Sequence, residues 1–223
     1  MKKKSTKINH RKHYYSFSKL VITALLGVTT CLTNVMAQTP FVNQNLVVLQ
    51  VGNGTRPLTG SSTNVSLEEF TPAGGFVNSH NVPITGANRL TLSGNGNSEG
   101  QITRSADYLK IVIAGYDADT GFQSVGTASS ASAVNRVIGS FDAAGNYSRP
   151  VSSSAFFSGN AFRSAVSSCD DYWGVGAGSS SGVNYFGTGA AGNVSSTNAR
   201  AMSCREKLSL KNLSCAFSAI VHL

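Results

Sequence analysis

The chain has 223 residues and a formal net charge of +8, from 18 basic and 10 acidic side chains. Seven of the basic residues precede Gln38, so the rest of the chain carries only 11 − 10 = +1. No basic patch interleaved with aromatic residues follows Gln38, and we therefore expect no nucleic-acid partner.

The first 37 residues have the order of an export signal. A basic stretch ends at Lys19, an apolar run covers 20–28, and Val35-Met36-Ala37 precedes Gln38. This order predicts a signal peptide over 1–37 and an exported protein that is secreted, periplasmic or at the cell surface. We expect membrane contact only through this signal. The alternatives are a retained anchor, for which the apolar run is short, and a lipoprotein signal at Cys31, against which Thr30 argues.

The stretch from Gln101 to Pro150 predicts one antiparallel meander. Its central run, YLKIVIAGY, is rich in β-branched residues, and turn-forming residues follow at 117–121 and 142–146. Pro150 indicates an edge strand. The predicted strands of this module are 101–105, 108–116, 133–141 and 147–151.

Parts of this module recur on both sides of it. Arg104-Ser105-Ala106 returns as Arg163-Ser164-Ala165, and the turn 141–146 has parallels at 70–75 and 185–193. The alternative is coincidence in a Gly/Ser/Ala-rich chain. Further strands are expected at 45–51, 65–70, 76–84, 89–93, 162–166, 172–175 and 183–186, with 155–161 opening the next copy, and no amphipathic helix is expected over 38–198. We therefore predict that residues 38–200 form an all-β domain of antiparallel meander repeats, resembling two to three blades of an incomplete β-propeller.

The last stretch, 201–223, breaks this pattern. It contains no glycine, whereas 22 lie between Gln38 and Arg200. We predict a truncated or frame-shifted end that is disordered or loosely helical, and a capping helix is the alternative. Because an incomplete propeller leaves its edges open, self-association through blade edges is expected. Pairing of Cys204 with Cys215 is left open.

Three short motifs carry a family resemblance: Arg104-Ser105-Ala106, 134–137 (VNRV) and 162–165 (FRSA). With these motifs, residues 46–198 resemble the N-terminal part of bacterial secreted β-propeller-like repeat proteins, which carry a signal peptide and often a C-terminal sorting or anchoring domain, absent here. The resemblance implies export and a repeated sheet fold, and it implies no defined catalysis.

Motifs that could support chemistry are weak. Residues 178–182 fit G-x-S-x-G formally, but no helix or histidine partner follows, so a loop is the better interpretation. The Asp117-x-Asp119-x-Gly121 pattern could begin a calcium loop, but later ligands are missing and a hairpin turn is favoured. Asp170-Asp171 is interpreted as a polar turn. We therefore predict no catalytic, metal-binding or cofactor-binding residue and no cofactor.

Two classes of function stay open. The first is a non-catalytic, secreted or cell-surface β-repeat protein that binds glycan or a cell-surface protein through rim loops. The second is a glycan-active hydrolase or lyase fragment of propeller architecture, which needs convergent carboxylates. The acids after Gln38 nearly all fall at predicted turns, and this distribution favours the first class.

Overall fold

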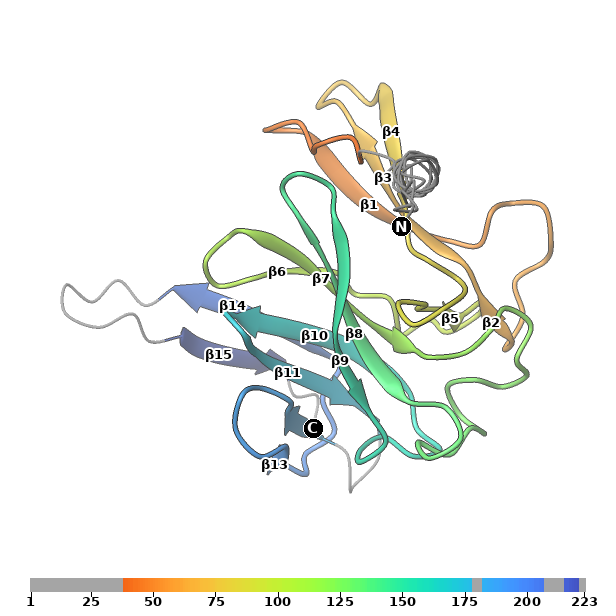
Figure 1. The fold of residues 1–223 in the computed structure, drawn as a ribbon, viewed down its shortest axis with the longest axis vertical. Helices are drawn as coiled ribbons and strands as arrows, with labels where there is room; N and C mark the ends of the chain where they lie inside the picture. The colour runs from red at the N-terminus through yellow and green to blue at the C-terminus, as the bar shows by residue number, and fades with distance from the viewer. Residues whose placement is uncertain (1–37, 178–181, 207–214, 221–223) are drawn as a thin grey trace, which may run out of the picture. The chain divides into compact units, whose positions relative to one another are not determined.

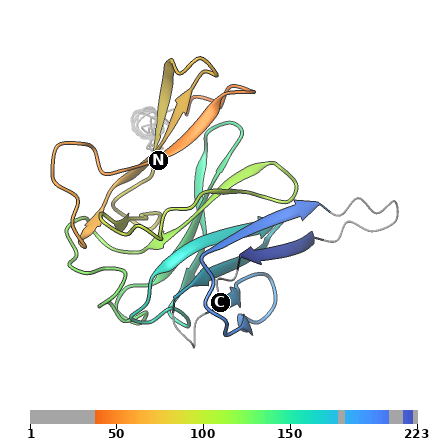
Figure 2. The same ribbon diagram turned by 180° about the vertical axis from the view of Figure 1, so that it is seen from behind.

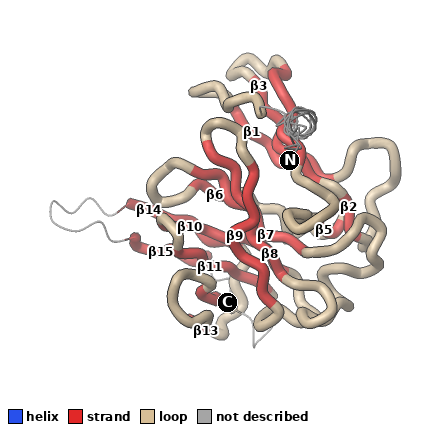
Figure 3. Tube along the Cα trace, in the orientation of Figure 1, coloured by secondary structure: helices blue, strands red, loops and turns tan. Residues whose placement is uncertain are grey.

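The computed structural model describes residues 38–177, 182–206 and 215–220. Its contacts divide the chain into residues 1–37 and a compact unit from Gln38 to Leu223. Within the described part of the chain every regular element is a strand, and all paired strands in the sheets are antiparallel (Figure 3). The all-β prediction is confirmed. These residues contain no helix that is long and apolar enough to cross a membrane.

Five sheets are formed (Figure 1). Sheet A has the order β1-β3-β4, sheet B pairs β2 with β5, and sheet C has the order β6-β7-β8-β9. Sheet D has the order β10-β11-β12-β13, and sheet E pairs β14 with β15. The strands are β1 Leu46–Val51, β2 Ser62–Thr63, β3 Val65–Phe70, β4 Phe76–Asn81, β5 Leu92–Ser93, β6 Thr103–Arg104, β7 Lys110–Tyr116, β8 Arg136–Asp142, β9 Tyr147–Ser153, β10 Phe162–Ser168, β11 Asp171–Gly176, β12 Val183–Tyr185, β13 Gly192–Ser195, β14 Ala201–Glu206 and β15 Cys215–Ile220.

Sheet C is the meander predicted over Gln101–Pro150. Strands β7 and β8 pair over their full length, from Lys110 opposite Asp142 to Tyr116 opposite Arg136. The edge strand β9 contains Pro150, as predicted, and the register shifts beside it, between Ile138 and Ser140 of β8. A bulge at an edge is a position where a proline removes no needed hydrogen bond.

Sheet C is covered on both faces. Val112 and Ala114 of β7 pack in one cluster with Phe162 and Ala165 of β10. The alternate residue Ile113 packs in a second cluster with the inner face of sheet A. Because side chains of a strand alternate between faces, a strand apolar at every position is suited to this central place. Successive sheets A, C and D therefore pack face to face.

The first strands of sheets C and D run side by side in parallel. Gln101 forms a parallel bridge with Ser164, the Thr103 hydroxyl donates to the carbonyl of Ala165, and the Ala106 amide donates to Ser167. The two Arg-Ser-Ala segments thus lie next to each other, which explains the small, buried side chains at Ser105, Ser164 and Ala165.

Several expectations are corrected. Residues 155–161 form a loop, in which Phe157 has a left-handed backbone and packs on Phe162. Strand β13 lies where a turn was predicted. The expectation of a loose helix after Arg200 is wrong for 201–206 and 215–220, which pair as β14 and β15 (Figure 2). Residues 207–214 and 221–223 lie outside the described residues, as does the predicted signal peptide.

The last described segment also covers sheet D. Ala199 and Met202 are buried in one cluster with Val166 and Val175, on the face of sheet D that points away from sheet C. The β14–β15 register places Cys204 opposite Phe217 and Cys215 opposite Glu206, so the cysteines are not directly paired across the hairpin.

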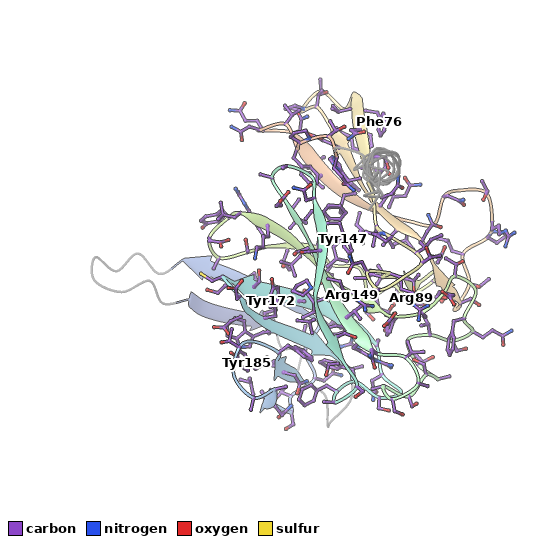
Figure 4. The ribbon with its side chains drawn as sticks, in the orientation of Figure 1. Phe76, Arg89, Tyr147, Arg149, Tyr172 and Tyr185 are labelled. Carbon is purple, nitrogen blue, oxygen red and sulfur yellow. The ribbon has the colours of Figure 1, made fainter. Side chains whose placement is uncertain are left out.

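The outer face of sheet A is the apolar face left uncovered. Leu46, Phe70 and Phe76 stand opposite one another across β1, β3 and β4, and the two phenylalanine rings meet edge to face. Leu46 and Phe76 are 59% and 60% exposed. Figure 4 shows Phe76 at the far end of this sheet, away from sheets C and D.

Candidate binding groove

A buried glutamate holds the segment that follows Gln38. Glu69 on β3 is fully buried, and its Oε1 accepts hydrogen bonds from the Val42 amide (2.7 Å) and the Asn45 side chain (2.8 Å). Nε2 of His80, on β4, lies 3.5 Å from the other carboxylate oxygen. The ring of Phe41 stacks on His80 with centroids 3.9 Å apart. We call residues 41–45 the N-terminal clip.

These contacts shift the pKa of Glu69. Burial alone would raise it, because the charged carboxylate loses water. Hydrogen bonds from Val42, Asn45 and His80, together with the charge of His80, outweigh that effect, and the pKa lies below its ordinary value. The clip is therefore held by an ionised carboxylate.

The N-terminal clip forms one wall of a groove of about 660 Å³. The opposite side is the β6–β7 turn, and the tip of the β8–β9 hairpin supplies the floor near Asp142 (Figure 1). This volume is in the ordinary range for small-ligand sites. The lining residues are Phe41, Val42, Asn43, Gln44, Asn45, Val47, Ile102, Thr103, Arg104, Tyr108, Leu109, Lys110, Ile111, Phe141, Asp142 and Ala143.

Tyr108 is the exposed aromatic residue of this groove. The sequence predicted it inside a strand, but β7 begins only at Lys110, and Tyr108 sits in the turn with a left-handed backbone (φ 62°) and 47% exposure. A non-glycine residue in this region costs backbone energy, and such residues are often found at functional sites. Gln44, on the facing clip, is also left-handed (φ 71°).

Side-chain hydrogen bonds of the turn fix Tyr108 in place. The Asp107 carboxylate accepts from the Ser105 hydroxyl and from the Leu109 amide (3.1 Å), and the Lys110 amide donates to the Ser105 oxygen (2.9 Å). Burial would raise the pKa of Asp107, but these hydrogen bonds and the charge of Lys110 lower it. Ser and Asp in such turns offer the backbone local partners, and this pattern before Tyr108 was the signal that could have revealed the turn.

Arg104 supports the tyrosine from below. Its guanidinium carbon lies 4.7 Å from the centre of the Tyr108 ring, a cation–π contact. Its Nε and Nη2 both donate to the Tyr108 carbonyl at 3.2 Å. The ring and its backbone are thus held by the same side chain.

A larger pocket, of about 810 Å³, lies beside the loop from Gly52 to Asn64. Its lining includes Arg56 and several threonine and serine hydroxyls, but no aromatic side chain. A sugar ring needs an apolar platform as well as polar partners, so the smaller groove is the better candidate.

The possible calcium loop is neutralised by arginines instead. Arg89 donates to Asp117 (2.6 Å) and to Asp119 (2.8 Å), and Arg149 lies 3.0 Å from the second Asp117 oxygen. Figure 4 shows Arg89 and Arg149 close together. Among the residues that the structure describes, no group of three or more His, Cys, Asp or Glu could hold a metal ion.

The other weak motifs have structural roles or are not described. Asp171 accepts hydrogen bonds from Tyr185 and Thr188, so Asp170-Asp171 belongs to a polar turn between β10 and β11. Cys169, in the same turn, is a free and exposed thiol. Residues 178–181 of the G-x-S-x-G segment lie outside the described residues.

One acidic residue that resembles a catalytic acid is used inside the fold. Burial raises the pKa of Glu99, partly offset by hydrogen bonds from Tyr116 and Ser93 and by the charges of Arg136 and Arg163. The Tyr116 hydroxyl donates to Glu99 (2.8 Å) and accepts from the Phe162 amide (2.9 Å). Glu99 lines neither of the two pockets described above, and we interpret it as a bridge between sheets.

Comparison of the chain with protein-family models, with curated proteins and with solved structures gives no match in any of the three. The functional argument therefore rests on the geometry of the groove.

Proposed function

We propose that this chain is an exported, non-catalytic β-repeat protein that binds a glycan in the groove between the N-terminal clip and the β6–β7 turn. The observation that carries the proposal is Tyr108, an exposed aromatic ring held in a left-handed turn by Arg104 and the Asp107 network. A preorganised ring of this kind provides a flat apolar surface for a sugar at low entropic cost.

The engagement of the carboxylates supports a non-catalytic role. Each of eight acids accepts hydrogen bonds from its own chain: Glu68, Glu69, Glu99, Asp107, Asp117, Asp119, Asp142 and Asp171. A glycoside hydrolase needs two carboxylates free to face one substrate. A propeller hydrolase or lyase fragment is the alternative, and release of reducing sugar would reveal it.

Two features support a propeller-like arrangement of repeats. Sheets C and D are both four-stranded meanders in chain order, and they pack face to face with their first strands parallel. Blades of a propeller have these properties. Self-association through open edges or faces is part of the proposal, and the exposed Leu46 and Phe76 are where we would test it.

Export fits the position of the N-terminal clip. The clip contacts begin at Phe41, whose amide donates to Ala143, so a mature chain starting at Gln38 would retain all of them. Mass spectrometry of protein collected outside the cytoplasm should find Gln38 as the first residue. Intact Met1 on such protein would contradict cleavage.

The groove is tested by binding to an array of soluble and insoluble glycans. We expect the chain to bind at least one glycan class and Tyr108→Ala to lose at least tenfold in affinity, since stacking on an aromatic ring contributes about 1–2 kcal/mol. Phe122→Ala is the matched control, because Phe122 is a 41% exposed aromatic residue that does not line the groove. Equal losses in both variants, or capture of a cell-surface protein but no glycan, would contradict the proposal.

A further inference from the structure

We infer that the ligand of this groove is an anionic glycan, one whose sugars carry carboxylate or sulfate groups. The inference rests on the proposed glycan binding and adds the chemical class of the ligand. Two cations, Arg104 and Lys110, line the groove on either side of Tyr108 in the chain. Among the described residues, neither forms a salt bridge, whereas Arg89 and Arg149 are paired with Asp117 and Asp119.

Arg104 presents a free edge to the groove. Its Nε and Nη2 are used by the Tyr108 carbonyl, and no hydrogen bond to Nη1 is formed by the part of the chain that the structure describes. The guanidinium has five N–H groups in a planar fork, and such a fork binds carboxylate or sulfate oxygens through paired hydrogen bonds. Since Arg104 is already held by Tyr108, little entropy is lost when an anion binds.

Lys110 supplies a second positive charge with a weak existing partner. Its Nζ makes one long hydrogen bond, 3.4 Å, to the carbonyl of Cys169. Its charge also lowers the pKa of Asp107, but the Asp107 carboxylate is bonded to Ser105 and Leu109 and does not line the groove. The ammonium group is therefore available to an incoming anion.

Asp142 makes the groove asymmetric. Its carboxylate accepts from the Asn146 amide (2.8 Å) and side chain (3.0 Å); burial would raise its pKa, but these hydrogen bonds lower it, so it stays charged. It lies on the β8–β9 tip, away from the β6–β7 turn that carries Arg104. An acidic sugar is thus directed with its anionic group toward Arg104 and Lys110 and its hydroxyl groups toward Asp142, which can accept hydrogen bonds from them.

The same charges argue against a nucleic acid in this groove. Binding a phosphate backbone depends on many cations that displace counterions. The chain after Gln38 carries a net charge of only +1, and the groove offers two cations and one acid. A short oligosaccharide with one or two anionic groups matches this number.

Calorimetry with the full chain and a matched pair of probes tests the inference. The probes are trigalacturonate and its methyl ester, which share one sugar skeleton and differ in charge, and a sulfated galactan oligosaccharide separates sulfate from carboxylate. We expect an anionic probe to bind about tenfold or more tighter than the ester, since charge-assisted hydrogen bonds are the stronger kind. The difference should shrink when salt is raised from 50 to 500 mM, because screening weakens exposed charge pairs.

Variants separate this inference from the proposed function. Lys110→Gln should weaken binding of the anionic probe about tenfold and leave the ester unchanged, because Lys110 does not support Tyr108. Arg104→Gln should act in the same direction, with circular dichroism verifying the fold, and Arg56→Gln in the other pocket should change nothing. Equal affinity for acid and ester, or an unchanged Lys110→Gln variant, overturns the inference and leaves the proposed function standing. If no probe and no arrayed glycan binds, both fall together.

Discussion

The guanidinium of Arg136 lies 5.2 Å from the centre of the Tyr116 ring, inside the interface between sheets C and D. Arg136 is fully buried, and in place of a carboxylate its Nη1 and Nη2 bind Ser129 and the carbonyl of Val134 at 2.7–3.1 Å. Burial lowers the pKa of Arg136, and the charges of Tyr116 and Glu99 oppose that effect. A buried cation surrounded by carbonyls joins the loop before β8 to the sheet.

Replacing Arg136 should therefore be costly. We expect Arg136→Met to lower the free energy of unfolding by about 2–4 kcal/mol, because the carbonyls of Ser129 and Val134 lose charged donors inside the protein. Urea unfolding measures the change. Arg56→Met at the 52–64 loop is the control, and a loss below about 0.5 kcal/mol for Arg136→Met would show that the loop is held by other contacts.

Gly145 should be essential for seating the N-terminal clip. Gly145 has φ +81°, and a Cβ there would lie only 2.4 Å from the carbonyl oxygen of Thr39. Gly121 has a similar φ of +91° with nothing within 4 Å of the added Cβ. Both Gly→Ala variants should lose about 1–2 kcal/mol for the left-handed backbone.

Only the Gly145→Ala variant should release the clip. Limited proteolysis followed by N-terminal sequencing should show faster cleavage near residues 38–45 in this variant than in Gly121→Ala. If both variants are cut there at the same rate, the close approach to Thr39 has no consequence for the clip.

Acid should loosen the N-terminal clip through Glu69. Because the pKa of Glu69 is lowered in the folded protein, its contribution to stability is present above the pKa of the unfolded chain, about 4.3, and is lost as the pH falls through the lower folded value. The stability difference between the native chain and Glu69→Gln should thus shrink from pH 6 to pH 3. Glu68→Gln, on the opposite face of β3, is the control. A difference that stays constant over this range would contradict the assignment.

Met202 should contribute to stability although its segment was expected to be dispensable. It is 3% exposed and packs with Val166 and Val175. We expect Met202→Ala to cost about 2–3 kcal/mol, by loss of buried apolar surface and a cavity, and removal of 201–223 to cost at least as much. Val194→Ala, at a 62% exposed position, is the control. Equal melting temperatures for residues 38–200 and 38–223 would restore the original expectation.

The sequence was sufficient for the strands of sheet C and for the all-β class. Runs of β-branched residues between Gly, Asp and Asn turns have a local meaning, because period and turn chemistry act over a few residues. Strands β7, β8 and β10 are found within two or three residues of the prediction. The turn at Tyr108 was missed because an aromatic residue beside an apolar run is indistinguishable from a strand start by periodicity.

The groove and its supports were decided by tertiary structure. Glu69 looked like a surface residue of an alternating strand, and only the docking of Val42 and Asn45, more than 20 residues away in the chain, makes it a buried anchor. Arg104 and Lys110 face the clip because sheets A and C pack together. Such proximity depends on how faces of separate sheets meet, and no local propensity encodes it. The sequence by itself determined which segments are strands; the packing of those strands determined where charges remain unpaired and a ligand can bind.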